Sequence, residues 1–108
     1  MVAIASITPA DLLRLFEGEN PPTLIDVREP WEFAYARLEM ARLLPLGSIG
    51  EWVHALDKQA TYVVMCHHGI RSEYACRMLS NLGFAHVANL EGGIDAWSRD
   101  VDRRVARY

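Results

Sequence analysis

The sequence lacks features that mark several classes of protein. It has no uninterrupted apolar run of the roughly 18 residues that a membrane-spanning helix needs. Its apolar first residues, 1–5, follow no basic leader, so we expect no signal peptide. Cysteine occurs only at Cys66 and Cys76, too rarely for a disulfide framework. We therefore expect a cytoplasmic protein, outside the membrane, whose two thiols are reduced.

Basic residues are also outnumbered, with 11 Lys and Arg against 14 Asp and Glu and a net charge of −3 at pH 7. This balance argues against nucleic acid or an anionic membrane as a partner. Lys58 is the single lysine, and the other basic residues are arginines, whose rigid fork suits oxyanions. A hydrophobic share of 51 % and a charged share of 23 % are typical of a folded protein. The 108 residues are enough for one domain, spanning 1–108.

Strand-like and helix-like segments alternate along the chain. Short apolar runs predict strands over residues 23–27, 43–46, 61–65 and 86–90. Amphipathic or capped segments predict helices from Pro9 to Gly18, from Pro30, over 48–56, over 72–82 and from Ile94. Two local details are predicted as well: Ser48 and Glu51 form a capping box, and Pro45 marks the end of a strand. This alternation predicts an α/β fold in three layers, with a central, mostly parallel sheet and helices on both faces.

One predicted strand-to-helix loop carries a nucleophile. Cys66 directly follows the strongest strand, at the carboxyl edge where open α/β sheets bind ligands. A thiol just before a helix is stabilised as thiolate by the helix dipole, and the N–H groups of residues 67–71 form an anion nest if the loop curls. Gly69 permits that curl through a positive φ, and Arg71 adds a fixed cation. We expect Cys66 to be ionised near neutral pH, beside a pocket for a small anion.

Three blocks of the sequence resemble the rhodanese-like sulfurtransferases. The loop Cys66-His67-His68-Gly69-Ile70-Arg71-Ser72 is similar to the active-site loop of that family. Residues 24–33 (LIDVREPWEF) and 89–97 (NLEGGIDAW) are similar to its N-terminal and C-terminal signatures. The three blocks stand in family order and tie together about residues 5–100.

The resemblance implies a mechanism and a set of partners. Cys66 attacks a small anionic sulfur donor such as thiosulfate, sulfite leaves, and the cysteine carries the sulfur as a persulfide. An acceptor then removes the sulfur; a small thiol, cyanide and a thioredoxin-like protein are the candidates. His67, His68, Gly69, Ile70, Arg71 and Ser72 are expected to form the substrate-binding loop. No organic cofactor is needed, and no metal is expected, because three consecutive residues do not readily converge on one ion.

Other residues have a structural interpretation beside the functional one. Asp26 and Arg28 end a strand on the side of Cys66 and could tune the loop, although a structural ion pair is the favoured interpretation. Cys76 is interpreted as a small core residue within a helix. Arg37 and Met40 depart from the family pattern, and we expect a local change in packing from them. The arginines of the tail, Arg99, Arg103, Arg104 and Arg107, are interpreted as a solvated face.

Three alternatives to a free-standing sulfurtransferase remain. A cysteine-dependent phosphatase or arsenate reductase also places a thiolate in an anion nest, but its arginine follows the cysteine by six positions and Arg71 follows by five. A non-catalytic regulatory module commonly lacks the cysteine. A persulfide carrier that is loaded by a partner enzyme needs the same loop, and the sequence does not separate it from an enzyme that uses thiosulfate.

Overall fold

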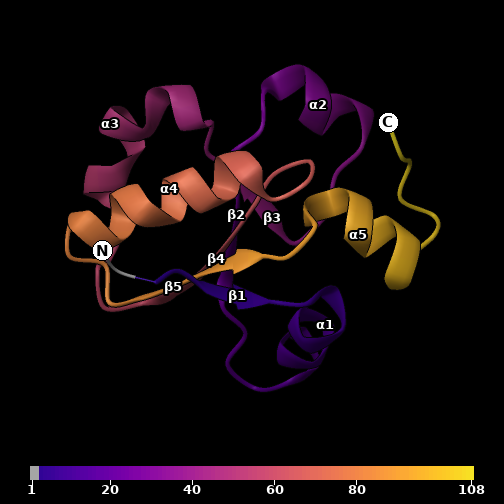
Figure 1. The fold of residues 1–108 in the computed structure, drawn as a ribbon, viewed down its shortest axis with the longest axis horizontal. Helices are drawn as coiled ribbons and strands as arrows, with labels where there is room; N and C mark the ends of the chain where they lie inside the picture. The colour runs from indigo at the N-terminus through magenta and orange to yellow at the C-terminus, as the bar shows by residue number, and fades with distance from the viewer. Residues whose placement is uncertain (1–2) are drawn as a thin grey trace.

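Five strands form one parallel sheet in the computed structural model, which describes residues 3–108 (Figure 1). The first two residues of the apolar N-terminal stretch lie outside the described part. The elements in chain order are β1 (Ala5–Ile7), α1 (Pro9–Glu17), β2 (Thr23–Asp26), α2 (Pro30–Tyr35), β3 (Ala41–Leu43), η1 (Leu46–Ser48), α3 (Ile49–Trp52), η2 (Val53–Ala55), β4 (Thr61–Met65), α4 (Ile70–Asn81), β5 (His86–Leu90) and α5 (Gly93–Asp100). Among residues 3–108, no helix combines the length and apolarity needed to cross a membrane.

The sheet order β1-β5-β4-β2-β3 puts β4 in the centre, and every neighbouring pair is parallel. Because parallel strands end at the same edge, the loops after β2, β4 and β5 gather there. Asp26 at the end of β2 pairs in register with Met65, the residue before Cys66. The topology therefore brings three loops that are far apart in sequence to the two sides of one cysteine.

Helices cover both faces of the sheet, as the sequence predicts. Figure 1 shows α3 and α4 on one side, with α1 and α5 on the other. The alternate residues of β4 enter different cores: Val64 packs among residues that include Leu79 of α4, and Val63 packs among residues that include Leu12 and Trp97 of α1 and α5. Both faces of the central strand are buried from Tyr62 onwards, which explains why residues 62–65 are an uninterrupted apolar run.

The first helix shows how local signals position an element. The Thr8 side chain accepts a hydrogen bond from the Asp11 N–H at 3.2 Å, and Pro9 occupies the first turn, where its missing N–H costs nothing. The helix ends before Gly18. The predicted helix over residues 9–18 is thus confirmed.

Three predicted boundaries are wrong. The strand over 43–46 is instead β3 at Ala41–Leu43, because residues that precede Pro45 complete the ladder with β2. The Ser48 hydroxyl donates to the Pro45 carbonyl and makes no cap, so the expected capping box is absent and α3 spans only Ile49–Trp52 between two 3-10 turns. The helix after Cys66 begins at Ile70 rather than at Ser72, because Gly69 is its N-cap.

Candidate active site

The loop after β4 curls around the sulfur of Cys66. Sγ accepts hydrogen bonds from the N–H of Gly69 at 3.1 Å, from the N–H of Ser72 at 3.4 Å and from the Ser72 hydroxyl at 3.3 Å. Gly69 has φ 104°, a left-handed conformation that side chains other than glycine rarely adopt. Cys66 is 1 % exposed, so the sulfur lies at the base of the loop, at the start of the 12-residue helix α4.

The first turn of α5 binds the loop through two backbone hydrogen bonds. The N–H of Ile94 donates to the Cys66 carbonyl at 2.9 Å, and the N–H of Asp95 donates to the His67 carbonyl at 3.1 Å. These bonds turn the loop carbonyls away from the sulfur. The approach is so close that a Cβ on Gly93 would lie 2.4 Å from the Cys66 carbonyl oxygen. Gly93 is therefore required for the loop and the helix to meet.

A buried side chain of β5, that of Asn89, forms hydrogen bonds with Gly69 and Ser72. The Asn89 side-chain N–H donates to the Gly69 carbonyl at 2.9 Å, and its Oδ1 accepts from the Ser72 hydroxyl at 2.5 Å. The Ser72 hydroxyl has one proton, so it donates at any moment either to Asn89 or to the sulfur of Cys66. Sequence analysis includes Asn89 in the block 89–97 that resembles the C-terminal signature of the family, but it assigns no role to this side chain.

Arg71 is paired with a carboxylate of α2. Its two terminal nitrogens donate to the two oxygens of Glu32 at 2.6 Å and 2.9 Å. Arg71, together with the N–H of Glu29 and the Tyr108 hydroxyl, lowers the pKa of Glu32 to about 2 against the opposing effect of burial. The sequence predicts Arg71 as part of the substrate-binding loop, and the structure places it in the first turn of α4, directly after the bend at Gly69. It also adds a partner, Glu32, which sequence analysis left unassigned.

Asp26 and Arg28 form a fully buried ion pair beside the loop. The side chains of both residues are 0 % exposed, and the Arg28 guanidinium donates to Asp26 at 2.7 Å and to the Ala36 carbonyl at 2.7 Å. Neither Asp26 nor Arg28 forms a hydrogen bond with Cys66. Their arrangement joins the end of β2 to the end of α2, as the structural interpretation expects.

The tail contributes Tyr108, which sequence analysis missed. After α5 the chain runs back towards α2 (Figure 1). The Tyr108 ring stacks on the His67 imidazole, with centroids 3.8 Å apart and planes 7° apart. Its hydroxyl donates to Glu32 at 2.7 Å and accepts from Arg28 at 2.8 Å. Tyr108 therefore connects the loop to both ion pairs, so the tail is not wholly a solvated face.

The two histidines of the loop form a stack rather than a cluster of ligands. The rings of His67 and His68 lie 3.9 Å apart. Burial, with a smaller effect from the charge of His68, lowers the pKa of His67, which favours the neutral imidazole. Within residues 3–108, no three His, Cys, Asp or Glu side chains converge in a way that could hold a metal ion.

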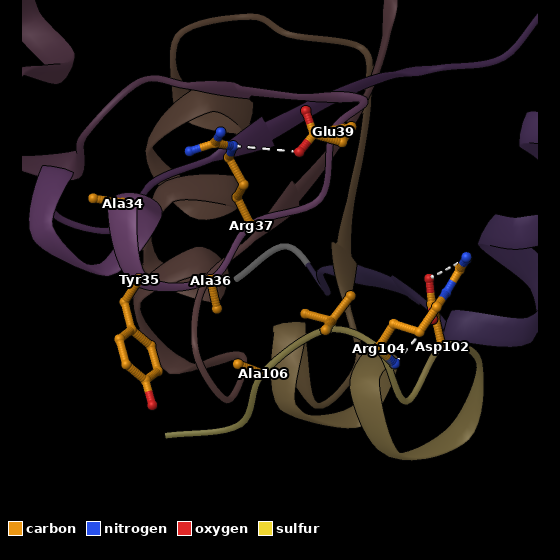
Figure 2. A pocket seen from close by; sticks show the side chains of 9 residues that line it. Ala34, Tyr35, Ala36, Arg37, Glu39, Asp102, Arg104 and Ala106 are labelled. Carbon is orange, nitrogen blue, oxygen red and sulfur yellow. Dashed lines mark hydrogen bonds and ion pairs between the residues drawn. The ribbon is translucent and has the colours of Figure 1, made fainter.

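A separate cavity of about 590 Å³ lies between α2 and the tail (Figure 2). Arg37 and Arg104 line it, and each is paired: Arg37 with Glu39 at 3.5 Å, and Arg104 with Asp102 at 2.9 Å. The residues that line it include neither a cysteine nor a histidine. Arg37, which departs from the family pattern, thus lies at this cavity and packs its guanidinium over the Phe33 ring at 5.3 Å.

Comparison with known proteins connects this geometry to a family. The rhodanese-like domain matches residues 8–100. The putative sulfurtransferase YtwF of Bacillus subtilis is 39 % identical, over 91 % of this chain and 94 % of that protein. The thiosulfate sulfurtransferase GlpE of Actinobacillus pleuropneumoniae is 33 % identical, over 86 % of this chain and 85 % of that protein.

The match extends to longer proteins and to solved structures. The probable adenylyltransferase/sulfurtransferase MoeZ of Mycobacterium tuberculosis is 32 % identical over 96 % of this chain, which spans about a quarter (27 %) of that relative. A rhodanese-like domain protein from Staphylococcus aureus has a TM-score of 0.84 at 28 % identity, over 97 % of this chain and 99 % of that one. The three-layer fold, the loop around Cys66 and these similarities agree: the chain belongs to the rhodanese-like domain family, whose members that resemble it are named as sulfurtransferases.

Proposed function

We propose that this protein transfers sulfane sulfur through a persulfide on Cys66. The observation that carries the proposal is the arrangement of three donors on one sulfur: the N–H groups of Gly69 and Ser72 and the Ser72 hydroxyl. Such donors stabilise an anionic sulfur without a metal. They would serve equally for the thiolate that attacks and for the persulfide that results.

The reaction proceeds in two displacements. The Cys66 thiolate attacks the outer sulfur of the donor, a sulfur–sulfur bond forms, and the donor's own sulfur–sulfur bond breaks. With thiosulfate, sulfite leaves with the bonding electron pair; with a persulfide, a thiolate leaves. An acceptor thiolate or cyanide then attacks the outer sulfur of the Cys66 persulfide, and the Cys66 thiolate is released. Ping-pong kinetics follow from this scheme.

The candidate partners are small. Thiosulfate is suggested as a donor by the name of the relative GlpE, and a persulfide donor is the other candidate. A small thiol, cyanide or a thioredoxin-like protein would accept the sulfur. The roles of His67, His68 and Ile70 in binding these molecules belong to the same proposal, since all three lie on the loop around Cys66.

A phosphatase reaction has less support. A tetrahedral oxyanion needs a full shell of donors and a guanidinium that faces it, but the terminal nitrogens of Arg71 face Glu32. The loop donates from Gly69 and Ser72 to the cysteine sulfur itself. We expect negligible hydrolysis of an aryl phosphate.

Intact-mass analysis tests the proposal. After incubation with thiosulfate or glutathione persulfide, the protein is expected to gain one sulfur, about 32 Da, as a persulfide that a thiol removes. Cys66→Ala should not gain it, whereas Cys76→Ala should. A protein that gains no sulfur from either donor, or a Cys66→Ala variant that gains as much as the native chain, would overturn the proposal.

A further inference from the structure

Two arginines of the site, Arg71 and Arg28, are both paired with carboxylates. Both terminal nitrogens of Arg71 bind Glu32, whose side chain is 4 % exposed. Arg28 binds Asp26, and neither side chain is exposed. The two pairs add no net charge to the site, because each guanidinium faces one carboxylate at hydrogen-bond distance.

The surroundings of His67 favour an uncharged ring. The His67 ring is stacked between His68 and Tyr108, and burial lowers its pKa, which favours the neutral imidazole. His68 lies 4.0 Å from Asp95, a carboxylate that also binds Arg107 at 2.9 Å. The groups that donate to the sulfur are neutral, and Arg71 and Arg28 each bind a carboxylate.

This charge balance discriminates between donors. Thiosulfate is a dianion whose charges lie within a few bonds of the reacting sulfur, and it must approach an anionic thiolate. Two such charges repel each other unless an uncompensated cation lies between or beside them. A persulfide R–S–SH is neutral at its reacting group when protonated, so it meets no such repulsion.

The surface beside the loop suits an organic substituent. Trp31 and Tyr35 of α2 are 65 % and 60 % exposed, and Ile70, the first residue of α4, is 80 % exposed. The Tyr108 ring lies against both aromatics of α2, with centroids 6.1 Å and 5.7 Å away, and stacks on His67. We call Trp31, Tyr35 and Tyr108 the aromatic rim. An organic thiol can contact this rim, whereas the sulfonate of thiosulfate has no apolar group to place on it.

We propose that the preferred sulfur donor of this site is a persulfide of an organic thiol rather than free thiosulfate. The inference rests on the proposed sulfurtransferase function. Cys66–S⁻ attacks the outer sulfur of R–S–SH, a sulfur–sulfur bond to Cys66 forms, and the sulfur–sulfur bond of the donor breaks. The leaving R–S⁻ takes the proton of the transferred group, which gives R–SH and Cys66–S–S⁻. Charge and atoms balance, and no oxidant is required.

Single-turnover loading measures the preference without an acceptor. The protein is mixed with either thiosulfate or glutathione persulfide, quenched in acid and weighed by mass spectrometry, with Cys66→Ala as the blank. The second-order rate constant for glutathione persulfide should exceed that for thiosulfate by about tenfold or more, as one unopposed charge pair near a surface would give. Equal or faster loading by thiosulfate overturns the inference and leaves the proposed function intact. Loading by neither donor overturns the function itself.

The dependence of the loading rate on salt concentration tests the charge of the site without a variant. If the site has no net positive charge, thiosulfate loading will be unchanged or faster as salt is raised from low to high concentration. A loading rate that falls steeply with salt would indicate attraction of the dianion to a cationic site, and would contradict the inference.

Glu32→Gln tests the cause of the preference. The substitution keeps the size and polarity of the side chain and leaves the charge of Arg71 uncompensated. Thiosulfate loading should rise by about tenfold, while persulfide loading should change by less than about threefold. A purely structural role for Glu32 would slow both donors together, and that result would contradict the charge argument.

The aromatic rim is tested separately. Trp31→Ala should slow loading by glutathione persulfide about threefold and leave thiosulfate unchanged, because only the organic donor contacts the rim. Leu15→Ala is the matched control, since Leu15 is an exposed apolar residue, at 44 %, on α1. Equal effects of the two substitutions on persulfide loading would remove the rim from the proposal.

Discussion

The two cysteines are equally hidden from solvent, yet their surroundings differ completely. Cys66 is 1 % exposed and Cys76 is 0 % exposed. The sulfur of Cys66 accepts from Gly69 and Ser72 at the start of α4, whereas Cys76 lies further along the same helix among core residues such as Leu79. Burial, with smaller effects from the charges of Glu73 and Cys66, raises the pKa of Cys76 to about 12. Burial alone therefore does not decide how a thiol behaves; the donors aimed at it do.

Alkylation kinetics give the largest expected difference between the two thiols. In the native protein at pH 7.5, iodoacetamide should modify Cys66 faster than Cys76 by on the order of a hundredfold or more, because only Cys66 has donors that stabilise a thiolate. Peptide mapping of time points measures both rates in one sample. In urea the two rates should converge. Equal rates in the native protein would remove the distinction on which the site rests.

Gly93→Ala should disrupt the loop around Cys66 and leave the packing around Cys76 unchanged. The added Cβ would lie 2.4 Å from the Cys66 carbonyl oxygen, so the loop and α5 must separate. We expect a loss of about 3 kcal/mol or more in the free energy of unfolding, together with slow alkylation of Cys66. Urea denaturation measures the first effect and peptide mapping the second.

Gly50→Ala is the matched control for Gly93→Ala. Gly50 lies in α3, and a Cβ there would meet nothing within 4 Å. This substitution should leave stability unchanged or raise it by up to about 1 kcal/mol, as alanine does in helices. A loss as large as that of Gly93→Ala would show that the contact with the Cys66 carbonyl is not the cause.

Acid should loosen the site around Cys66 through Glu32. The pKa of Glu32 is held at about 2 in the folded protein against an ordinary value of 4.5, so its stabilising contribution is complete above pH 5 and is lost as the pH falls towards 2. By linkage the contribution is about 3 kcal/mol. Urea denaturation between pH 5 and pH 2 should show a steeper loss of stability in the native chain than in Glu32→Gln. Parallel pH profiles would contradict the assignment.

Ser72→Ala should give the smallest change. It removes one of three donors to the Cys66 sulfur and keeps the backbone N–H. We expect Cys66 alkylation to slow by about fivefold, the effect of one hydrogen bond of about 1 kcal/mol. Ser80→Ala on the same helix is the control and should leave the alkylation rate unchanged.

The parts of the fold that could be predicted depend on local signals. Residues 61–65 form β4 as predicted, because five uncharged residues, three of them β-branched, favour a buried strand. The predicted helix over 48–56 is broken into short turns, because the Ser48 hydroxyl and the Trp52 indole N–H both donate to the Pro45 carbonyl. These side-chain bonds are local, three and seven positions apart, but hydrophobic periodicity does not reveal that a proline carbonyl accepts both.

In the site, too, the features that could be predicted are those that depend on local sequence signals. Gly69 and its positive φ could be predicted, since a cysteine before a helix needs a tight bend there. Glu32, Asn89 and Tyr108 could not, because their partners lie 39, 17 and 76 positions away along the chain. What brings them together is the order of parallel strands and the return of the tail, which only the folded structure specifies.

The contact between α5 and the loop also determines when, during synthesis of the chain, the surroundings of Cys66 are complete. The carbonyls of Cys66 and His67 accept hydrogen bonds from the N–H groups of Ile94 and Asp95. A growing chain that has released residues up to Gly92 from the ribosome already contains the nucleophile and Asn89, but it lacks these two N–H groups. The loop around Cys66 therefore completes its contacts only after the start of α5 has been synthesised, and Cys66 in a fragment truncated before α5 should be alkylated more slowly than in the native protein.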